Sequence, residues 1–367
     1  MKVLCLGAGL QGLEVAYLGL KAGWDVTLVD RRKTAPACGL AHAVVTDLSR
    51  LDAFGLSGLC FGYDLIVPAI EDLAILERLS EARAKKLIPP LAFDLEAYRL
   101  SSSKILSKKL FKRLLYYTPR DFNRQIIPDL PKDPAHEIAF VAKPSGLSGS
   151  KGVKVFNDYR ELLREFPEPE DAKDMVFEEF IEGPMYSVEV TAVNGMAKSH
   201  QVTLLGMDAQ SDCNKVTAPS GLSRFREAKF RKIAANLAKE MNLTGIMDLE
   251  AILMDDKFYL LEIDARFPSQ TPITVYWSTG INLLVELAAC FVKIPPKTPR
   301  LKKPAQNKSV TFEQFMVVRG KPRPYGERLF TTLGPVTLVP GFMGSNEALV
   351  AGNPKSSHFG VTLIRAH

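Results

Sequence analysis

The sequence has few cysteines and no long apolar run. Its five cysteines are scattered over 367 residues, are odd in number and show no CxxC spacing, which excludes a disulfide framework and favours free thiols in a reducing cytosol. No apolar stretch approaches the roughly 18 residues that a membrane span needs. The apolar N-terminus is interrupted by Gln11 and Glu14, so it does not read as a signal peptide. The five histidines form no metal-ligand cluster.

Composition is that of an ordinary soluble protein, with 46% hydrophobic and 24% charged residues. The length predicts two or three domains. Much of the net charge of +6 comes from Lys293–Lys308, where prolines alternate with basic residues. Because no aromatic residue interrupts this stretch, it indicates an extended connector rather than a nucleic-acid patch.

The N-terminus follows a strand–glycine turn–helix–strand pattern. Lys2–Leu6 is an apolar strand, Gly7–Gly12 has the form G-x-G-x-x-G, and a second strand ends at Asp30. The pattern suits a dinucleotide, and equally any doubly wound domain with a small ligand at its strand ends. Further strand signals stand at Ala43–Val45, Leu65–Val67 and, weakly, Lys86–Ile88, so residues 1–92 predict one small α/β domain.

The middle of the chain carries lysines and a loop of small residues. Glu96–Tyr117 predicts one helix that includes Lys104, and Ile138–Lys143 predicts a strand ending in lysine. The loop Pro144–Gly152 can fold its N–H groups over phosphates, although it is no Walker A motif and many such loops are plain turns. Met175–Gly183 can hold an adenine. Later signals are strands at Val153–Phe156, Tyr186–Val190 and His200–Leu205, helices at Phe225–Met241 and Ile281–Val292, and short β-like runs from Val310.

An acidic hairpin is the most informative feature of the sequence. Met247–Glu250 and Phe258–Arg266 are β-forming runs with acids inside them. A three-residue turn at Asp255–Lys257 would place Glu250 opposite Glu262 and Asp248 opposite Asp264, whereas a two-residue turn would send the two sets to opposite faces. The first register gathers carboxylates that need a cation, and Mg²⁺ with a nucleotide suits them. The plain alternative is a hairpin with one solvated face.

The order of these motifs resembles the ATP-grasp superfamily of carboxylate–amine ligases. The resemblance implies a fold of class α/β and α+β, in which a Rossmann-like N-terminal domain precedes two α+β subdomains that clasp ATP. It implies domains at 1–92, at 93–181 with a glycine-rich lid, and at 182–367 with a β-rich C-terminal region. Glu250, Glu262 and Asp264 match the Mg²⁺-binding pattern E-x11-E-x-N/D of the superfamily, with Asp264 in the position that is often Asn.

Four blocks narrow the resemblance to the ligases of pyrrolysine biosynthesis. These blocks are Leu10–Glu14, Ala92–Arg99, Gly245–Ala251 and Glu262–Pro272. The resemblance implies that (3R)-3-methyl-D-ornithine is joined to the ε-amine of L-lysine through an acyl phosphate, with ATP and Mg²⁺ and release of ADP. The resemblance runs to about residue 295. It departs at about 107–175, a stretch that is longer here than is usual in these ligases, and again after residue 300.

The resemblance also implies which residues bind the ligands. ATP would contact Lys104, Lys143, Ser148, Glu178, Glu179, Phe180, Ile181, Asp30, Asp47 and Leu48. The lysine substrate would contact Leu10, Gln11, Glu71 and Thr271, and the ornithine-type substrate would contact Ser187, Val188, Glu189, Asp248, Pro268, Ser269, Gln270 and Thr271. Metal ligands would be Glu250, Glu262 and Asp264. Arg266 is the candidate for stabilising the oxyanion, or alternatively a counter-charge for the acids.

Three rival functions remain open at this point. A nicotinamide-dependent dehydrogenase would explain the first 30 residues but not the acidic hairpin. Another ATP-grasp enzyme, an amino-acid ligase or a purine-type carboxylase, would share the nucleotide residues. A nucleic-acid-binding protein could use the basic connector. The favoured hypothesis, an ATP-grasp ligase, predicts small-molecule amino-acid substrates and a cytoplasmic location. It predicts neither nucleic acid nor a membrane as partner, and it allows a homodimer.

Overall fold

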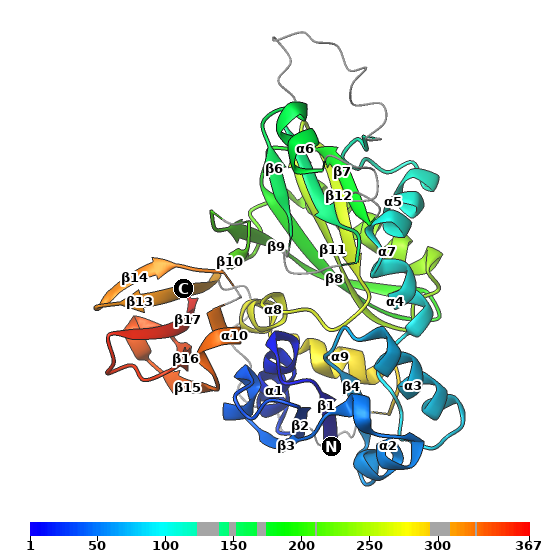
Figure 1. The fold of residues 1–367 in the computed structure, drawn as a ribbon, viewed down its shortest axis with the longest axis vertical. Helices are drawn as coiled ribbons and strands as arrows, with labels where there is room; N and C mark the ends of the chain where they lie inside the picture. The colour runs from blue at the N-terminus through cyan, green and yellow to red at the C-terminus, as the bar shows by residue number, and fades with distance from the viewer. Residues whose placement is uncertain (123–138, 147–151, 167–173, 210, 294–308, 327–328) are drawn as a thin grey trace.

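The computed structural model describes residues 1–122, 139–146, 152–166, 174–209, 211–293, 309–326 and 329–367 (Figure 1). It begins with a four-stranded parallel sheet of order β3-β2-β1-β4. Strands β1 and β4 are almost wholly apolar because both of their faces are buried. The elements of this part are β1 (Lys2–Leu6), α1 (Leu10–Ala22), β2 (Asp25–Asp30), η1 (Pro36–Gly39), β3 (His42–Val45), η2 (Leu48–Arg50), α2 (Ala53–Cys60), β4 (Leu65–Pro68) and α3 (Leu73–Ala84).

The predicted strand at Lys86–Ile88 is wrong. Lys86 has φ 58, which places it in a left-handed turn after α3. The chain reaches the sheet slightly later, where Leu91 forms an isolated parallel bridge with Ile66.

The single helix predicted at Glu96–Tyr117 is two helices. These are α4 (Leu95–Ser101) and α5 (Lys104–Arg113). The break falls at Ser103, whose side-chain oxygen accepts the N–H of Leu106 at 3.4 Å and caps α5. As a result Lys104 stands in the first turn of a new helix.

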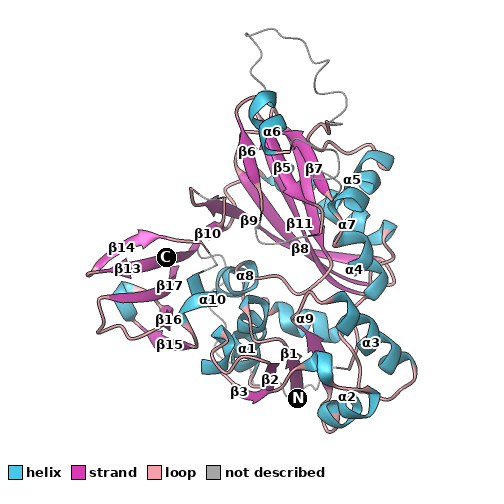
Figure 2. Cartoon of the chain, in the orientation of Figure 1, coloured by secondary structure: helices cyan, strands magenta, loops and turns pink. Residues whose placement is uncertain are grey.

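A small antiparallel sheet follows, of order β6-β5-β7. Its own core is aromatic and includes Phe140, Phe156 and Phe177. Figure 2 shows this sheet, with α6 beside it, at the end of the molecule opposite the N-terminal sheet. The elements are β5 (Phe140–Pro144), β6 (Lys154–Phe156), α6 (Tyr159–Glu165) and β7 (Met175–Glu179).

A ten-stranded sheet forms the rest of the molecule, in the order β12-β11-β8-β9-β10-β13-β17-β16-β15 with β14 paired to β13. Helix α7 covers one face of its first strands, where Phe230 and Leu237 pack against Val188 and Leu249. The opposite face of β8, β11 and β12 is not covered by α7, and the acids of the hairpin lie on it. The strands are β8 (Met185–Val193), β9 (Met196–Met207), β10 (Cys213–Ala218), β11 (Gly245–Met254), β12 (Lys257–Asp264), β13 (Val310–Val318), β14 (Lys321–Pro324), β15 (Val336–Pro340), β16 (Glu347–Ala351) and β17 (His358–Ala366). The helices are α7 (Arg224–Glu240), α8 (Thr271–Thr279), α9 (Leu283–Ala289), α10 (Leu329–Leu333) and η5 (Phe342–Gly344).

Helix α8 is not among the helices that the sequence predicts. It lies with α1 and α9 in one hydrophobic core that also reaches the C-terminal strands. Tyr17 of α1 donates to Glu347 of β16 at 2.6 Å and accepts from Trp277 of α8 at 2.8 Å. The N-terminal and C-terminal parts of the chain are therefore packed together around α8 (Figure 1).

The mixed α/β and α+β class predicted from the sequence is confirmed. The divisions after residues 92 and 181 stay predictions. Within the described ranges, no helix is both long enough and apolar enough to cross a membrane.

Candidate functional site

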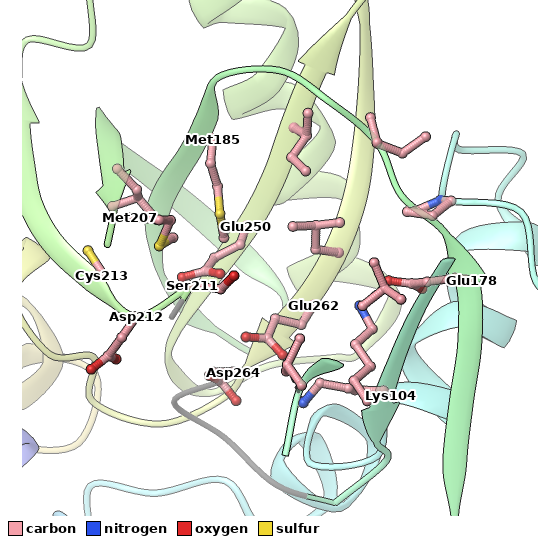
Figure 3. A pocket seen from close by; sticks show the side chains of 18 of the residues that line it. Lys104, Glu178, Met185, Met207, Ser211, Asp212, Cys213, Glu250, Glu262 and Asp264 are labelled. Atoms are coloured by element: carbon pink, nitrogen blue, oxygen red, sulfur yellow. Dashed lines mark ion pairs between the residues drawn. The ribbon is translucent and has the colours of Figure 1, made fainter. Parts of the chain in front are cut away.

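A cavity of about 410 Å³ lies between the small sheet and the β11–β12 hairpin. Figure 3 shows Lys104 and Glu178 on one side of it, the acids of the hairpin in the middle, and Met185, Met207 and Cys213 on the other side. Its walls therefore combine charged and apolar groups from distant parts of the chain. Apolar lining residues are Val141, Val153, Val155, Met185, Leu205, Met207, Ile252 and Leu261.

The hairpin has the predicted pairs but not the predicted turn. Glu250 lies opposite Glu262 and Asp248 opposite Asp264. The turn has only two residues, Asp255 and Asp256, with φ 48 and 63, since Met254 pairs directly with Lys257. Both positive φ values suit the tight turn whose twist matches the strands.

A β-bulge restores the register that this short turn would have lost. Ala251 pairs with Leu260 and Glu250 with Glu262, which leaves Leu261 as an extra residue in β12. Both Leu261 and Glu262 line the cavity. Without Leu261 as an extra residue, the two-residue turn would have directed Glu262 into the core beneath α7.

Three basic side chains meet the acids. Lys104 Nζ lies 3.0 Å from Glu262 Oε2, and Arg266 lies 2.9 Å from Asp264 and 3.2 Å from Glu71. Lys143, at the end of the small sheet, pairs with Glu178. The acidic hairpin is thus not a solvated face but one half of a buried charge network.

Burial and neighbouring charges perturb several pKa values here. Burial raises the pKa of Asp264 to about 6, against the opposing effect of Arg266. Burial opposes ionisation of Glu262 too, but Lys104 and Lys143 outweigh it and lower its pKa. The pKa of Lys104 is raised, because the carboxylates around it overcome its own burial. Lys104 and Glu262 therefore stay charged near neutral pH.

A second pair of acids lies deeper on the same face. Asp248 of β11 is paired in register with Glu189 of β8, and both are buried. Burial raises the pKa of Glu189 to about 7, and burial together with Asp264 and Glu250 raises that of Asp248 well above its usual range. The hydroxyls of Ser187 and Thr271 lie near Glu189 and partly oppose this, without reaching hydrogen-bond geometry. Two buried acids that lie next to each other favour the binding of a cationic group supplied by a ligand.

The acids of the hairpin fit Mg²⁺ only as a partial ligand set. In the part of the chain that is described, no three Asp, Glu, His or Cys side chains converge closely enough to hold a metal by themselves. Mg²⁺ in nucleotide sites takes one or two carboxylates and completes its shell with phosphates and water. Glu250 and Glu262, opposite each other on the cavity wall, match that share, while Asp264 is held by Arg266.

Most of the predicted ATP contacts line the cavity. Glu178 is buried and held from both sides, by Lys143 and by Lys108, whose Nζ lies 2.5 Å from it. Phe180 is 46% exposed and available to a ligand. Ser148 falls outside the described residues. Those on the wall are Lys104, Lys143, Glu178, Glu179, Phe180 and Ile181.

Three predicted ATP contacts lie away from the cavity, in the N-terminal part of the chain. Asp30 accepts the N–H of Ala8 at 3.0 Å and so holds the glycine turn. Asp47 accepts Ser49 N at 3.0 Å and caps η2, while Leu48 is buried in the local core. These three residues make contacts within the N-terminal part of the chain, and their predicted contact with ATP stays a prediction.

The predicted substrate residues divide in the same way. Pro268, Ser269, Gln270, Thr271 and Asp248 line the cavity. Ser187 and Glu189 share the face of Asp248 and Glu250 through the pairing of β8 with β11. The side chain of Val188 alternates to the other face and packs beneath α7, so any contact of this residue with the substrate stays a prediction.

Leu10, Gln11 and Glu71 do not line the cavity. Gln11 Nε2 donates to Glu71 Oε1 at 3.0 Å, and Glu71 reaches Arg266. Leu10 packs against the large core. Through Glu71, the N-terminal part of the chain therefore contacts one residue of the cavity wall, Arg266.

Sequence reasoning missed two features of the site. Buried Lys108 contacts Glu178 and also Asp121 at 2.5 Å, a pairing across the chain that no local pattern indicates. The loop between β9 and β10 brings Asp212 and Cys213 to the wall, and its Asp208 accepts the N–H of Gly326 at 3.0 Å. The C-terminal region thus supports a wall of the cavity.

The chain is similar to known proteins along almost its whole length. Residues 101–270 match the model of the ATP-grasp domain. The 3-methyl-D-ornithine–L-lysine ligase of Methanosarcina barkeri is 34% identical over 333 residues, which is 90% of this chain and 84% of that protein. The ligase of the same name from Methanosarcina mazei is 35% identical over 292 residues, 79% of this chain and 72% of that one.

Solved structures resemble the fold at much lower identity. An ADP complex of N5-carboxyaminoimidazole ribonucleotide synthetase has a TM-score of 0.71 with 15% identity, covering 99% of this chain and 92% of that one. The biotin carboxylase domain dimer of Hydrogenobacter thermophilus 2-oxoglutarate carboxylase, with MgADP, has a TM-score of 0.72 with 18% identity, covering 100% and 86%. At such identities the likeness concerns the fold alone.

Proposed function

Because the chain belongs to the family of the 3-methyl-D-ornithine–L-lysine ligases, which are ATP-grasp enzymes, we propose that it joins (3R)-3-methyl-D-ornithine to the ε-amine of L-lysine and releases ADP. The resemblance drawn from the sequence and the ATP-grasp architecture are both confirmed. The reaction belongs to pyrrolysine biosynthesis. At the level of the site, one observation carries the proposal: Glu250 and Glu262 line the same cavity as Lys104 and Lys143.

ATP would lie with its phosphates at Lys104 and Lys143. Both lysines are buried and both line the cavity, so their charges act in a medium of low dielectric constant. The apolar wall and the segment Glu179–Ile181 would hold the adenine. Binding of ATP requires the ammonium group of Lys143 to contact a phosphate oxygen as well as Glu178, with which it is paired here.

Mg²⁺ would be held by Glu250 and Glu262, with Asp264 next to them, and would neutralise charge that develops on the phosphates. Glu262 is kept ionised by Lys104, which a metal ligand requires. Asp264 can join this ligand set only by sharing its present contact with Arg266.

The ornithine-type substrate would place an ammonium group between Glu189 and Asp248. These acids are buried, their pKa values are raised, and no cation among the described residues pairs with them at salt-bridge distance. An ammonium group would bring the missing charge. A carboxylate oxygen of the ornithine-type substrate then attacks the γ-phosphorus of ATP, which forms an acyl phosphate and releases ADP.

The second half-reaction would use the N-terminal side of the site. The lysine ε-amine, once deprotonated, attacks the acyl carbon. The bond between that carbon and the bridging oxygen breaks, so phosphate leaves with the oxygen that came from the substrate carboxylate. Arg266 has a side chain that is only 10% exposed, lines the cavity and is oriented by Asp264 and Glu71, so its guanidinium can stabilise the tetrahedral oxyanion. Glu71 and Gln11 would receive the lysine substrate beside it.

Product analysis tests this function. The purified protein is incubated with ATP, Mg²⁺, L-lysine and either D-ornithine or its 3-methyl form, and the products are identified by mass. We expect ADP, phosphate and an amide that forms only when both amino acids are present. Release of AMP, or nucleotide hydrolysis that is indifferent to lysine, would contradict the proposal.

A further inference from the structure

The cavity wall contains a strained turn at Gln270. This residue has φ 65 and ψ −46, and the N–H of Thr271 donates to the carbonyl of Ser269 at 2.7 Å. A γ-turn of this hand is rare and strained for a residue with a Cβ atom. Ser269 and Thr271, on either side of the strained residue, both line the cavity. Something must therefore hold the turn in place.

The carboxylate of Glu14 holds it from the N-terminal part of the chain. Glu14 stands on α1 and is only 1% exposed. Its Oε1 accepts the N–H of Gln270 at 3.0 Å, and its Oε2 accepts the N–H of Ile273 at 2.9 Å. Hydrogen bonds to an ionised acceptor are stronger than neutral ones, and the negative charge also suits the N-terminus of α8.

The side chain of Gln270 is fixed from the opposite direction. Its Nε2 donates to the carbonyl of Cys213 at 2.9 Å and to Oε1 of Gln314 at 3.0 Å. Gln314 is buried and belongs to β13 of the C-terminal region. The turn is thus held from three directions, by α1, β10 and β13, whereas Ser269 and Thr271 line the cavity.

We propose that Glu14 is a positioning residue of the ligase. By holding the strained turn, it fixes Ser269 and Thr271 against the amino-acid substrate, although it does not itself line the cavity. The role rests on the proposed function of the cavity, because only that function makes the wall a substrate contact. It also gives the N-terminal part of the chain a direct influence on substrate affinity.

Glu14→Gln tests the proposal. The amide retains one accepting oxygen but turns an NH₂ group toward a backbone N–H. We expect the KM for D-ornithine to rise roughly tenfold or more, because one charge-assisted hydrogen bond is lost and another weakened. The KM for ATP should stay within about twofold, since the nucleotide wall does not touch Glu14. Amide hydrogen exchange in the segment 269–273 should become faster in the variant.

Asp94→Asn is the matched control. Asp94 also accepts two backbone N–H groups from different segments, Ala97 at 3.0 Å and Thr244 at 2.9 Å, and it lies outside the cavity. It should lower thermal stability without changing either KM or the exchange of segment 269–273.

Hydrogen exchange needs no turnover, so it separates a failure of this inference from a failure of the proposed reaction. Unchanged exchange in segment 269–273 of Glu14→Gln would overturn the inference. An equal rise in the KM values for ATP and D-ornithine would overturn it as well. If Glu14→Gln does not fold, Glu14→Asp keeps the charge but shortens the reach to one N–H, and the same two readouts apply.

Discussion

Replacing Glu189 by glutamine should make the protein more stable and less able to bind substrate. Glu189 is fully buried on β8, and neither of its carboxylate oxygens accepts a hydrogen bond within the described residues. Glutamine has nearly the same shape but carries no charge. The variant therefore removes the cost of an ionised group in an apolar position and leaves the packing unchanged.

The size of the effect follows from the pKa of Glu189. Burial raises it from 4.5 to about 7. A carboxyl group whose pKa is raised by folding costs nothing while it is protonated below about pH 4.5, and the cost grows as the pH rises through 7. The full difference corresponds to about 3 kcal/mol in the free energy of unfolding. Glu189→Gln should therefore gain about 2–3 kcal/mol more over wild type at pH 8 than at pH 5.

Thermal unfolding of both proteins at pH 5 and pH 8, without ligands, measures this difference. For a chain of this size we expect the increase in Tm to be a few degrees larger at pH 8 than at pH 5. Glu178→Gln is the control, because Glu178 is equally buried but lies between Lys108 and Lys143. That substitution should destabilise at both pH values by roughly 3–5 kcal/mol. An identical gain for Glu189→Gln at the two pH values would refute the reasoning.

Three further substitutions test other parts of the account. Lys108→Met leaves the buried carboxylate of Glu178 to Lys143 alone, so the KM for ATP should rise about tenfold and Tm should fall, and an unchanged KM would contradict this. Glu262→Gln should reduce kcat for ADP formation by more than about a hundredfold while the circular dichroism spectrum stays that of wild type; substantial residual turnover would remove the metal assignment. Tyr17→Phe removes the hydrogen bonds to Glu347 and Trp277, and should cost about 2–3 kcal/mol measured by urea unfolding, with an unaltered midpoint arguing against that contact.

The beginning of the fold could be predicted because its signals are local. The run Lys2–Leu6, the glycine turn and the strand that ends at Asp30 all appear where the sequence places them. The helix predicted over Glu96–Tyr117 failed for a local reason too, since Ser102 and Ser103 can begin a helix as well as interrupt one.

The acidic hairpin was predicted correctly in its pairs and wrongly in its turn. The sequence Asp255-Asp256 lacks the glycine that commonly marks a two-residue turn. A signal for the bulge was nevertheless present, because Leu260 and Leu261 are adjacent apolar residues that interrupt the alternation of β12. Two departures from regular geometry cancel, and the acids reach the same face.

The charges that complete the site could not be predicted in this way. Lys108 meets Glu178 and Glu14 meets Gln270 only because the folded chain brings distant segments together. Neither pair has a spacing or a flanking pattern that marks it. Val188 shows the converse, since it stands between two residues on the face of Asp248 and Glu250 and points by alternation into the core.

The central claim is that this cavity activates a carboxylate with ATP and passes it to an amine. It is tested most directly with D-ornithine labelled with ¹⁸O in its carboxylate, incubated with ATP, Mg²⁺ and L-lysine. Attack of the carboxylate on the γ-phosphorus predicts one labelled oxygen in each phosphate released, and unlabelled ADP. Label in AMP, or phosphate that carries none, would contradict the account.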